Sequence, residues 1–254
     1  MHSVSLESFY PLMWLAAIGY ARVAPVFYLM PFLNSGVLTG MVRQCAIFLT
    51  VLGLSPLARC VLPPFDMVTY AVLLAHEALT GLVAGVVLSM PFWVFHAVGS
   101  LIDNQRGATI SSTMDPANGV ETSELANFFN LFAATAFLAG GGMHLLLDTL
   151  AQSYAMAPIT GPLRLDLTEA FPLIGQLMTR CLLLASPVYL TMLASEVLLG
   201  VLSRFAPQLN AFSVAMTVKS ALALIVMLIC FGGSYTPEVA KLSHALSFAH
   251  WVAH

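Results

Sequence analysis

Long apolar stretches dominate this chain, and they restrict what it can fold into more than any other feature. A helix needs about 20 apolar residues to cross the hydrocarbon core of a bilayer. Six segments approach or exceed that length: Pro11–Leu33, Val42–Leu62, Met67–Ile102, Leu125–Leu150, Phe171–Ser203 and Ala211–Gly233. The pattern predicts an all-α, multi-span membrane protein with long kinked helices and helical hairpins.

Two of these segments are too long for one simple crossing. Met67–Ile102 and Phe171–Ser203 would each extend roughly 50 Å as a straight helix, and each holds a proline near its middle, Pro91 and Pro187. Because proline lacks the amide N–H and clashes with the preceding turn, we expect kinks or breaks there. Bent helices and helical hairpins both remain open. In the fourth segment, Gly140–Gly142 permits a close helix approach or a break.

The composition supports a membrane protein and argues against nucleic acid as a partner. The chain is 59% hydrophobic and 8% charged, with a mean hydropathy of +0.89. Soluble domains average roughly 25% charged residues, so too little polar sequence is present to cover a water-exposed surface. The net charge is -3 and the pI about 6.1. We see no basic stripe that could neutralise phosphates.

Among the charged residues inside the apolar segments are Arg22, Glu77, Arg180 and Glu196. An unpaired charge at the bilayer centre costs at least about 3 kcal/mol. We therefore expect these side chains to be buried against protein, water or one another. Two interpretations are open. They form ion pairs that fix the helix register, or some of them line a polar conduit or a subunit interface.

The sequence carries no recognisable catalytic, metal or cofactor motif, and we predict that the chain is not an enzyme and binds no cofactor. His76–Glu77 begins like the HExxH motif of zinc proteases, but Thr80 stands where the second histidine would be. No GxSxG nucleophile motif and no GxxxxGK[ST] phosphate loop occurs. The four cysteines form no CxxC pair, and we interpret them as small packing residues.

The polar stretch Asp103–Glu124, which separates the third and fourth segments, is the most specific feature of the sequence. Its core, IDNQRGATISSTMDPANG at Ile102–Gly119, resembles the signature loop of the type III secretion export-gate family, the FliR, YscT and SpaR (SctT) proteins. ARVAPVFYLMPFLNSGVL at Ala21–Leu38 and ASPVYLTMLASEVLLGVLSRFAPQLNAF at Ala185–Phe212 resemble other blocks of that family, and TVKS at Thr217–Ser220 then opens the last span. The likeness is closest to the virulence-type SpaR branch.

The resemblance implies a structural subunit of the export gate. Such a subunit assembles with two smaller membrane proteins, one in five copies and one in four, to form the channel for unfolded secreted proteins. It also implies contact with the export switch protein and the large export gate protein, and a multi-pass location in the bacterial inner membrane with the core displaced toward the periplasmic side. The whole chain, 1–254, would be one export-gate domain. Residues 10–170 resemble the five-copy partner, 171–233 form a hairpin resembling the four-copy partner, and 234–254 form a C-terminal tail.

The family resemblance makes the polar loop a plug in the pore. We assign the plug to Gly107–Asn118, with the candidate residues Gly107, Ile110, Ser111, Met114, Asp115 and Pro116. Glycine, serine and threonine make such a loop easy to move, and an unbranched methionine can seal against chains of many shapes. Asp103, Gln105 and Arg106 would anchor its first end, with Asp115 and Pro116 at the other. The alternative is a solvated connector between two helices.

The resemblance also places polar residues at the tip of the C-terminal hairpin, against neighbouring subunits. These residues are Arg204, Gln208, Asn210 and Lys219. Glu77 and Glu196 would then be intersubunit partners for such cations. An ordinary helix turn with polar caps is the alternative for the tip. For the chain as a whole, a small-solute permease is the main alternative and an intramembrane enzyme a more distant one.

Overall fold

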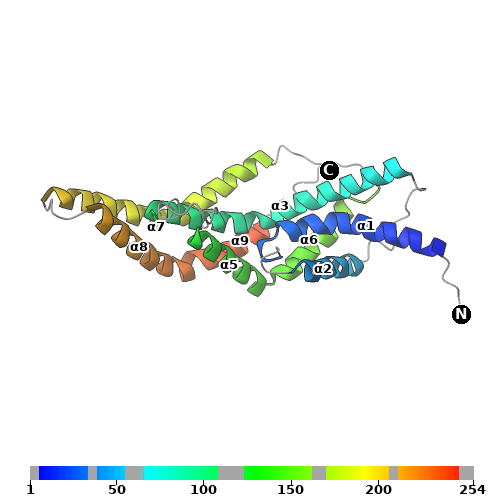
Figure 1. Cartoon of the computed structure of the whole chain (residues 1–254), viewed down its shortest axis with the longest axis horizontal. Helices are drawn as coiled ribbons and strands as arrows, with labels where there is room; N and C mark the ends of the chain where they lie inside the picture. Colours follow the sequence, from blue (N-terminus) through cyan, green and yellow to red (C-terminus); the bar gives the residue numbers. More distant parts are fainter. Residues whose placement is uncertain are drawn as a thin grey trace. The chain divides into compact units, whose positions relative to one another are not determined.

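The computed structural model of the chain describes residues 6–33, 39–54, 64, 66–107, 123–161, 170–205 and 211–245 (Figure 1). Every element in this part of the chain is helical, which confirms the predicted all-α class. The elements are α1 (Leu6–Leu29), the 3-10 turn η1 (Pro31–Leu33), α2 (Gly40–Gly53), α3 (Met67–Arg106), α5 (Glu124–Ala139), α6 (Gly142–Met156), α7 (Ala170–Phe205), α8 (Ala211–Cys230), the π-helical turn η4 (Phe231–Tyr235) and α9 (Thr236–Ala245).

Three of the described helices are long and apolar enough to cross a bilayer. They are Met67–Arg106, Pro172–Phe205 and Val214–Ser243. α5 and α6 together would make a fourth span, but they are bent by 78° at a short break. Not all six apolar segments therefore become full-length helices. α2, for example, has 14 residues, or about 21 Å, less than the roughly 30 Å of a hydrocarbon core.

The two prolines predicted to kink or break the long segments both lie inside uninterrupted helices. α3 contains Pro91 and α7 contains Pro187, so neither segment is a helical hairpin. At Pro187 the structure shows how the missing hydrogen bond is replaced. The carbonyl oxygen of Leu183 would normally accept from the amide at position 187, and it accepts instead from the Ser186 hydroxyl at 2.8 Å. A neighbouring hydroxyl that satisfies the freed carbonyl makes proline tolerable inside an apolar helix.

The helix ends follow local capping chemistry. Asp66 precedes α3 and accepts from the Thr69 hydroxyl (2.8 Å) and the Thr69 backbone N–H (3.1 Å). These hydrogen bonds stabilise the ionised carboxyl and lower the pKa of Asp66 below its ordinary value. Between α5 and α6, Gly141 has a φ of 83°, a left-handed conformation that glycine adopts without a steric penalty. The glycine run thus forms a break rather than a straight helix.

Contacts divide the chain into two compact units. The first comprises Met1–Met90, Leu138–Phe171 and Ser243–His254, and the second comprises Pro91–Phe137 and Pro172–Leu242. The first unit contains α1, α2, the first part of α3, and α6. α1 approaches α3 at two glycines. A Cβ atom at Gly81 would lie 2.0 Å from the Arg22 carbonyl oxygen, and one at Gly85 would lie 3.1 Å from the Val26 Cα.

The second unit is built around aromatic side chains from α3, α5 and the π-helical turn. Phe129 and Phe231 stack at a centroid distance of 5.8 Å, and Tyr235 meets the edge of Phe129 at 5.3 Å. Phe95 contacts Phe129 and Tyr235 as well. The Tyr235 hydroxyl donates to the Leu184 carbonyl oxygen at 3.3 Å. η4 therefore ties the end of α8 to α3, α5 and α7 within this unit.

Candidate functional site

The polar loop has a closed base in the second unit, formed where α3 ends and α5 begins. Asp103, in the last turn of α3, is 1% exposed. Its Oδ2 accepts from the Ser123 hydroxyl at 2.6 Å and from the Leu125 backbone N–H at 2.9 Å. Close packing makes these contacts reachable, since a Cβ atom at Gly99 would lie 2.5 Å from the Ala126 Cα. One carboxylate therefore joins the two helices that flank the loop.

The other predicted anchors lie on the α3 side of the base. The Arg106 Nε donates to the Asp103 Oδ1 at 2.7 Å, a contact within one helix turn. Gln105 is half-buried. Gly107 has a φ of 78°, and its N–H bonds to the Asn104 carbonyl oxygen at 3.2 Å, so a left-handed residue ends the helix. The other predicted plug residues lie outside the described residues: Ile110, Ser111, Met114, Asp115 and Pro116.

The second half of the loop base was missed in the sequence. Ser123 donates to Asp103 and accepts from the Ala126 N–H at 3.1 Å, so it is the N-cap residue of α5. A serine directly before an apolar run is a known helix-start signal and could have indicated this cap. No sequence signal indicated that the cap would be shared with a side chain from the preceding helix.

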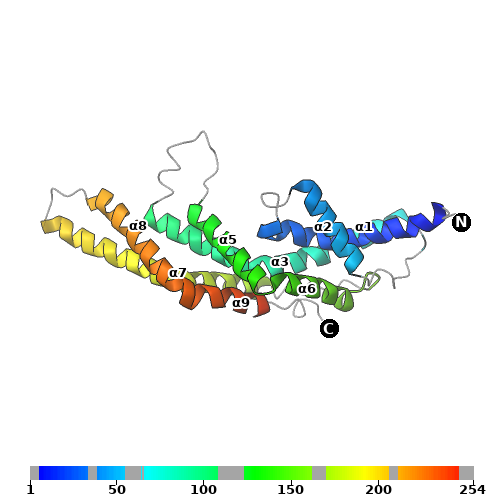
Figure 2. The ribbon, with the colours of Figure 1, turned by 90° about the horizontal axis from the view of Figure 1, so that it is seen from below.

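The hairpin of α7 and α8 holds an ion pair in the second unit. The two helices lie side by side in both views (Figures 1 and 2). The Lys219 Nζ lies 2.7 Å from the Glu196 Oε2, and the two side chains are 11% and 52% exposed. Arg204 is exposed near the end of α7, while Gln208 and Asn210 lie outside the described part of the chain. Glu196, predicted to meet a cation of another subunit, thus has a cation of its own chain beside it.

Arg180 is a second charge on α7 that the structure leaves at the surface of the chain. Its Nη1 lies 2.6 Å from the Glu238 Oε1 in α9, and the Arg180 side chain is 49% exposed. Lys241 is 3.7 Å from the other oxygen of Glu238. Arg180 and Glu196 were predicted to be buried charges, and in this chain both are half-exposed members of ion pairs. Their long side chains reach beyond the apolar helix surface to a partner.

Arg22 and Glu77 are both buried completely, in the first unit. Both side chains are 0% exposed. The Arg22 Nε donates to the Glu77 Oε2 at 2.6 Å, and its Nη2 donates to the Oε1 at 2.7 Å, so the pair is bidentate. The partner that had been predicted for Glu77 in another subunit is therefore supplied within the chain.

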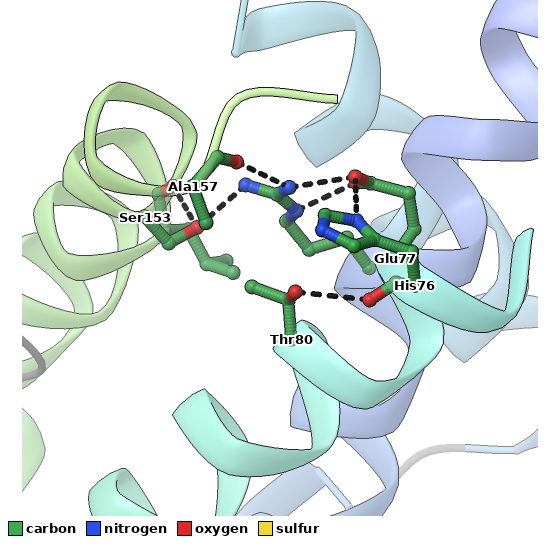
Figure 3. A network of polar contacts seen from close by, with 7 residues as sticks. His76, Glu77, Thr80, Ser153 and Ala157 are labelled. Carbon is green, nitrogen blue, oxygen red and sulfur yellow. Dashed lines mark hydrogen bonds and ion pairs between the residues drawn. The ribbon is translucent and has the colours of Figure 1, made fainter. Parts of the chain in front are cut away.

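Three further groups contact the Arg22 guanidinium. Nη2 also donates to the Ala157 carbonyl oxygen at 2.7 Å, and Nη1 donates to the Ser153 hydroxyl at 3.4 Å. The guanidinium lies 4.1 Å from the centre of the Tyr154 ring. Figure 3 shows Ser153 and Ala157 on one side of this network and His76 and Glu77 on the other. The network thus fastens α1 and α3 to the end of α6.

Sequence reasoning did not find the residues that build this network around the pair. Ser153 and Ala157 carry no distinctive pattern. The close approach of α1 and α3 did leave a signal, because Gly81 and Gly85 form a GxxxG spacing in an apolar helix. His76 bonds to Glu77 through Nδ1 at 3.2 Å. Within the described ranges, no three His, Cys, Asp or Glu side chains are placed to hold a metal ion.

The chain matches the profile of the bacterial export proteins, family 1, over residues 13–243. It is 48% identical over 237 residues to the surface presentation of antigens protein SpaR of Salmonella typhimurium, which covers 93% of this chain and 90% of that protein. It is 30% identical to the Yop proteins translocation protein T of Yersinia pestis, over 82% of each chain. It is 27% identical to the flagellar biosynthetic protein FliR of Bacillus subtilis, over 73% of each chain.

Proposed function

This chain belongs to the bacterial export proteins, family 1, the family of SpaR, YscT and FliR, and on that premise we propose that it is a structural subunit of a type III secretion export gate in the bacterial inner membrane. The observation that carries the proposal is the 48% identity to SpaR over 93% of the chain. A family of export proteins also agrees with the prediction that the chain is not an enzyme.

The surface of the α7–α8 hairpin supports a role inside a larger membrane assembly. Many of its large apolar side chains are more than half exposed, among them Ile174, Leu182, Leu190, Val197, Leu198 and Phe205 on α7 and Ile225, Leu228 and Ile229 on α8. A large apolar surface of this kind is unfavourable in water, so lipid or partner helices have to cover it. We propose that two other gate subunits, one in five copies and one in four, cover part of it.

The loop between α3 and α5 is the proposed plug of the channel. Asp103 joins the two helices that flank the loop, so the two ends of the loop start close together, which agrees with a plug that projects from one point. The sequence between the ends is rich in glycine, serine and threonine and contains Met114. In the proposal, this stretch blocks small ions while the gate is at rest and moves aside for an unfolded polypeptide.

Assembly is tested by co-expressing the chain with the two neighbouring membrane subunits and sizing the detergent-extracted complex. We expect one large complex that contains all three proteins, and a heterogeneous or unstable chain when the partners are left out. A chain that is monodisperse alone, and that carries a small solute into liposomes, would instead be a permease.

The plug is tested by deleting 107–118 in the assembled complex and measuring ion leakage. Leakage should rise while the yield of the complex stays the same. Unaltered leakage from a correctly assembled deletion complex would refute the plug and leave the assembly role untouched.

A further inference from the structure

We propose that Asp103 is the positioning residue that keeps the base of the polar loop closed and thereby holds the plug in its resting place. The inference rests on the proposed function of the loop as a plug. It adds a specific attachment, in which one buried carboxylate of α3 supplies the hydrogen-bond acceptor for the start of α5. Opening the base would require this carboxylate to release the Ser123 hydroxyl and the Leu125 N–H.

The geometry differs from that of an ordinary helix cap. A helix start is normally capped by the residue just before it, as Asp66 caps α3 by accepting from the Thr69 N–H. Asp103 instead lies 22 residues before Leu125, on the far side of the loop, and still accepts from that amide. It therefore serves as a cap for α5 and as a connection between the two helices at once.

Burial makes this connection hard to replace. Asp103 is 1% exposed, so water is not at hand to take over the hydrogen bonds that it makes. An ionised carboxylate without partners in such a place is strongly disfavoured. Its Oδ2 serves Ser123 and Leu125, and its Oδ1 serves Arg106. The closed base is thus the arrangement in which both oxygens are satisfied.

Arg106 and Ser123 make different contacts with Asp103, so mutations can test the two contacts separately. Arg106 lies three residues after Asp103 in the same helix, so their ion pair joins α3 only to itself. Ser123 lies 20 residues away on the α5 side. If closure of the base matters, loss of the Ser123 contact between the helices should open it more than loss of the Arg106 contact within α3.

Close packing of α3 against α5 holds Asp103 beside the start of α5. The backbones of Gly99 and Ala126 meet four residues before Asp103 and one residue after Leu125. Gly107, with its φ of 78°, then ends α3 one turn after Asp103. The packed part of the base therefore extends along α3 as far as Gly107, the first residue of the proposed plug.

The test uses the assembled three-subunit complex and measures ion leakage and protein export per complex. Asp103→Ala should raise leakage the most. Ser123→Ala removes one of the two bridging contacts and should raise leakage roughly tenfold, the change in an equilibrium expected for one hydrogen bond to a charged group. Asp103→Asn keeps an acceptor oxygen and should fall between Ser123→Ala and the parent. The double variant Asp103→Ala/Ser123→Ala should leak no more than Asp103→Ala alone, because both changes break one contact.

Two further variants separate the closed base from other effects. Asp66→Ala removes a carboxylate that caps the start of the same helix, where it accepts from Thr69, and it should leave leakage unchanged. Arg106→Gln breaks the ion pair within α3 and should raise leakage less than Ser123→Ala does. If Asp103→Ala lowers the amount of complex, the leakage per complex of Asp103→Asn and Ser123→Ala decides the question.

Outcomes that contradict the proposal are distinct from failure of the plug itself. If deletion of 107–118 raises leakage and neither Ser123→Ala nor Asp103→Asn does so, the base does not position the plug and the inference is wrong. Independent, multiplying effects of Asp103→Ala and Ser123→Ala would also refute it. If the deletion has no effect on leakage, the proposed plug is wrong.

Discussion

Two ion pairs in this chain look alike in the sequence and differ in the structure. Arg22–Glu77 and Lys219–Glu196 each join two charged residues from apolar helices, at 2.6 and 2.7 Å. The first pair is 0% exposed on both sides, whereas Glu196 in the second is 52% exposed. Arg22 also binds a hydroxyl and a backbone carbonyl within the chain. One pair is complete inside the subunit, and the other presents an open carboxylate on its surface.

The difference teaches that a charge in an apolar segment can mark two levels of structure. A fully enclosed pair has to form for the subunit to fold, because a buried charge without its partner is costly. A half-exposed pair contributes little to folding by itself, and its open side is free to contact other molecules. We therefore expect changes at the first pair to act on the chain and changes at the second to act on assembly.

The largest effect is expected for Glu77→Ala. The substitution leaves the Arg22 guanidinium buried without its counter-ion and should destabilise the chain by about 3–5 kcal/mol. The tagged chain should be scarce in membranes and elute as aggregate in detergent, with or without partners. A double replacement of both residues by apolar ones, Arg22→Met/Glu77→Leu, should restore much of the chain level, since no unpaired charge remains. A normal amount of the Glu77→Ala chain in membranes would refute the claim that the enclosed pair is needed for folding.

A smaller loss is expected for Gly81→Ala, which tests the helix contact that supports the enclosed pair. The added Cβ would lie 2.0 Å from the Arg22 carbonyl oxygen, so α1 and α3 have to separate. Overpacking of this kind costs about 1–3 kcal/mol. The thermal stability of the detergent-solubilised complex should fall accordingly. Gly200→Ala in α7 is the matched control, because nothing lies within 4 Å of a Cβ there, and it should be neutral or slightly stabilising.

The smallest effect on the chain itself is expected at Glu196. Glu196→Gln should change its stability by up to about 1 kcal/mol, and the chain should reach the membrane at its normal level. Glu196→Lys places two cations together on the hairpin and should block co-purification with the partner subunits. If Glu196→Lys assembles normally, the open side of the pair faces no partner and the comparison fails. If Glu196→Lys instead lowers the amount of the chain itself, both ion pairs are needed for folding and the distinction between them is wrong.

The class of the fold was predictable because it follows from the lengths of the apolar segments. The paths of the long helices were not predictable. Hydropathy does not show which group donates a hydrogen bond to the backbone carbonyl oxygen that a proline leaves free. The prediction of a kink or break at Pro187 did not foresee that the Ser186 hydroxyl would bond to the Leu183 carbonyl oxygen. The position of Arg22 in an apolar segment indicated correctly that it needs partners. It did not indicate which partners, because one of them is the backbone oxygen of Ala157, and every residue carries such an oxygen.

The candidate site was predictable to a similar degree. The unusual polar loop was visible by composition, and Asp103 and Arg106 were named as anchors at its first end. The far end was assigned to Asp115 and Pro116, which lie outside the described residues, while the structure places Ser123 and the Leu125 amide at the base. A contact across the loop depends on the packing of Gly99 against Ala126. Such a tertiary approach is not recorded in the local sequence.

The Arg22 network joins pieces of the chain that the ribosome makes at different times. Glu77 lies 55 residues after Arg22, and Ser153 lies 131 residues after it. At about 5–20 residues per second, Glu77 is added roughly 3–11 s after Arg22, and Ser153 roughly 7–26 s after it. For that interval the newborn first helix carries a cation that still lacks its counter-ion. Because an unpaired charge at the bilayer centre costs at least about 3 kcal/mol, the first helix reaches its final paired position only after much later parts of the polypeptide have been made.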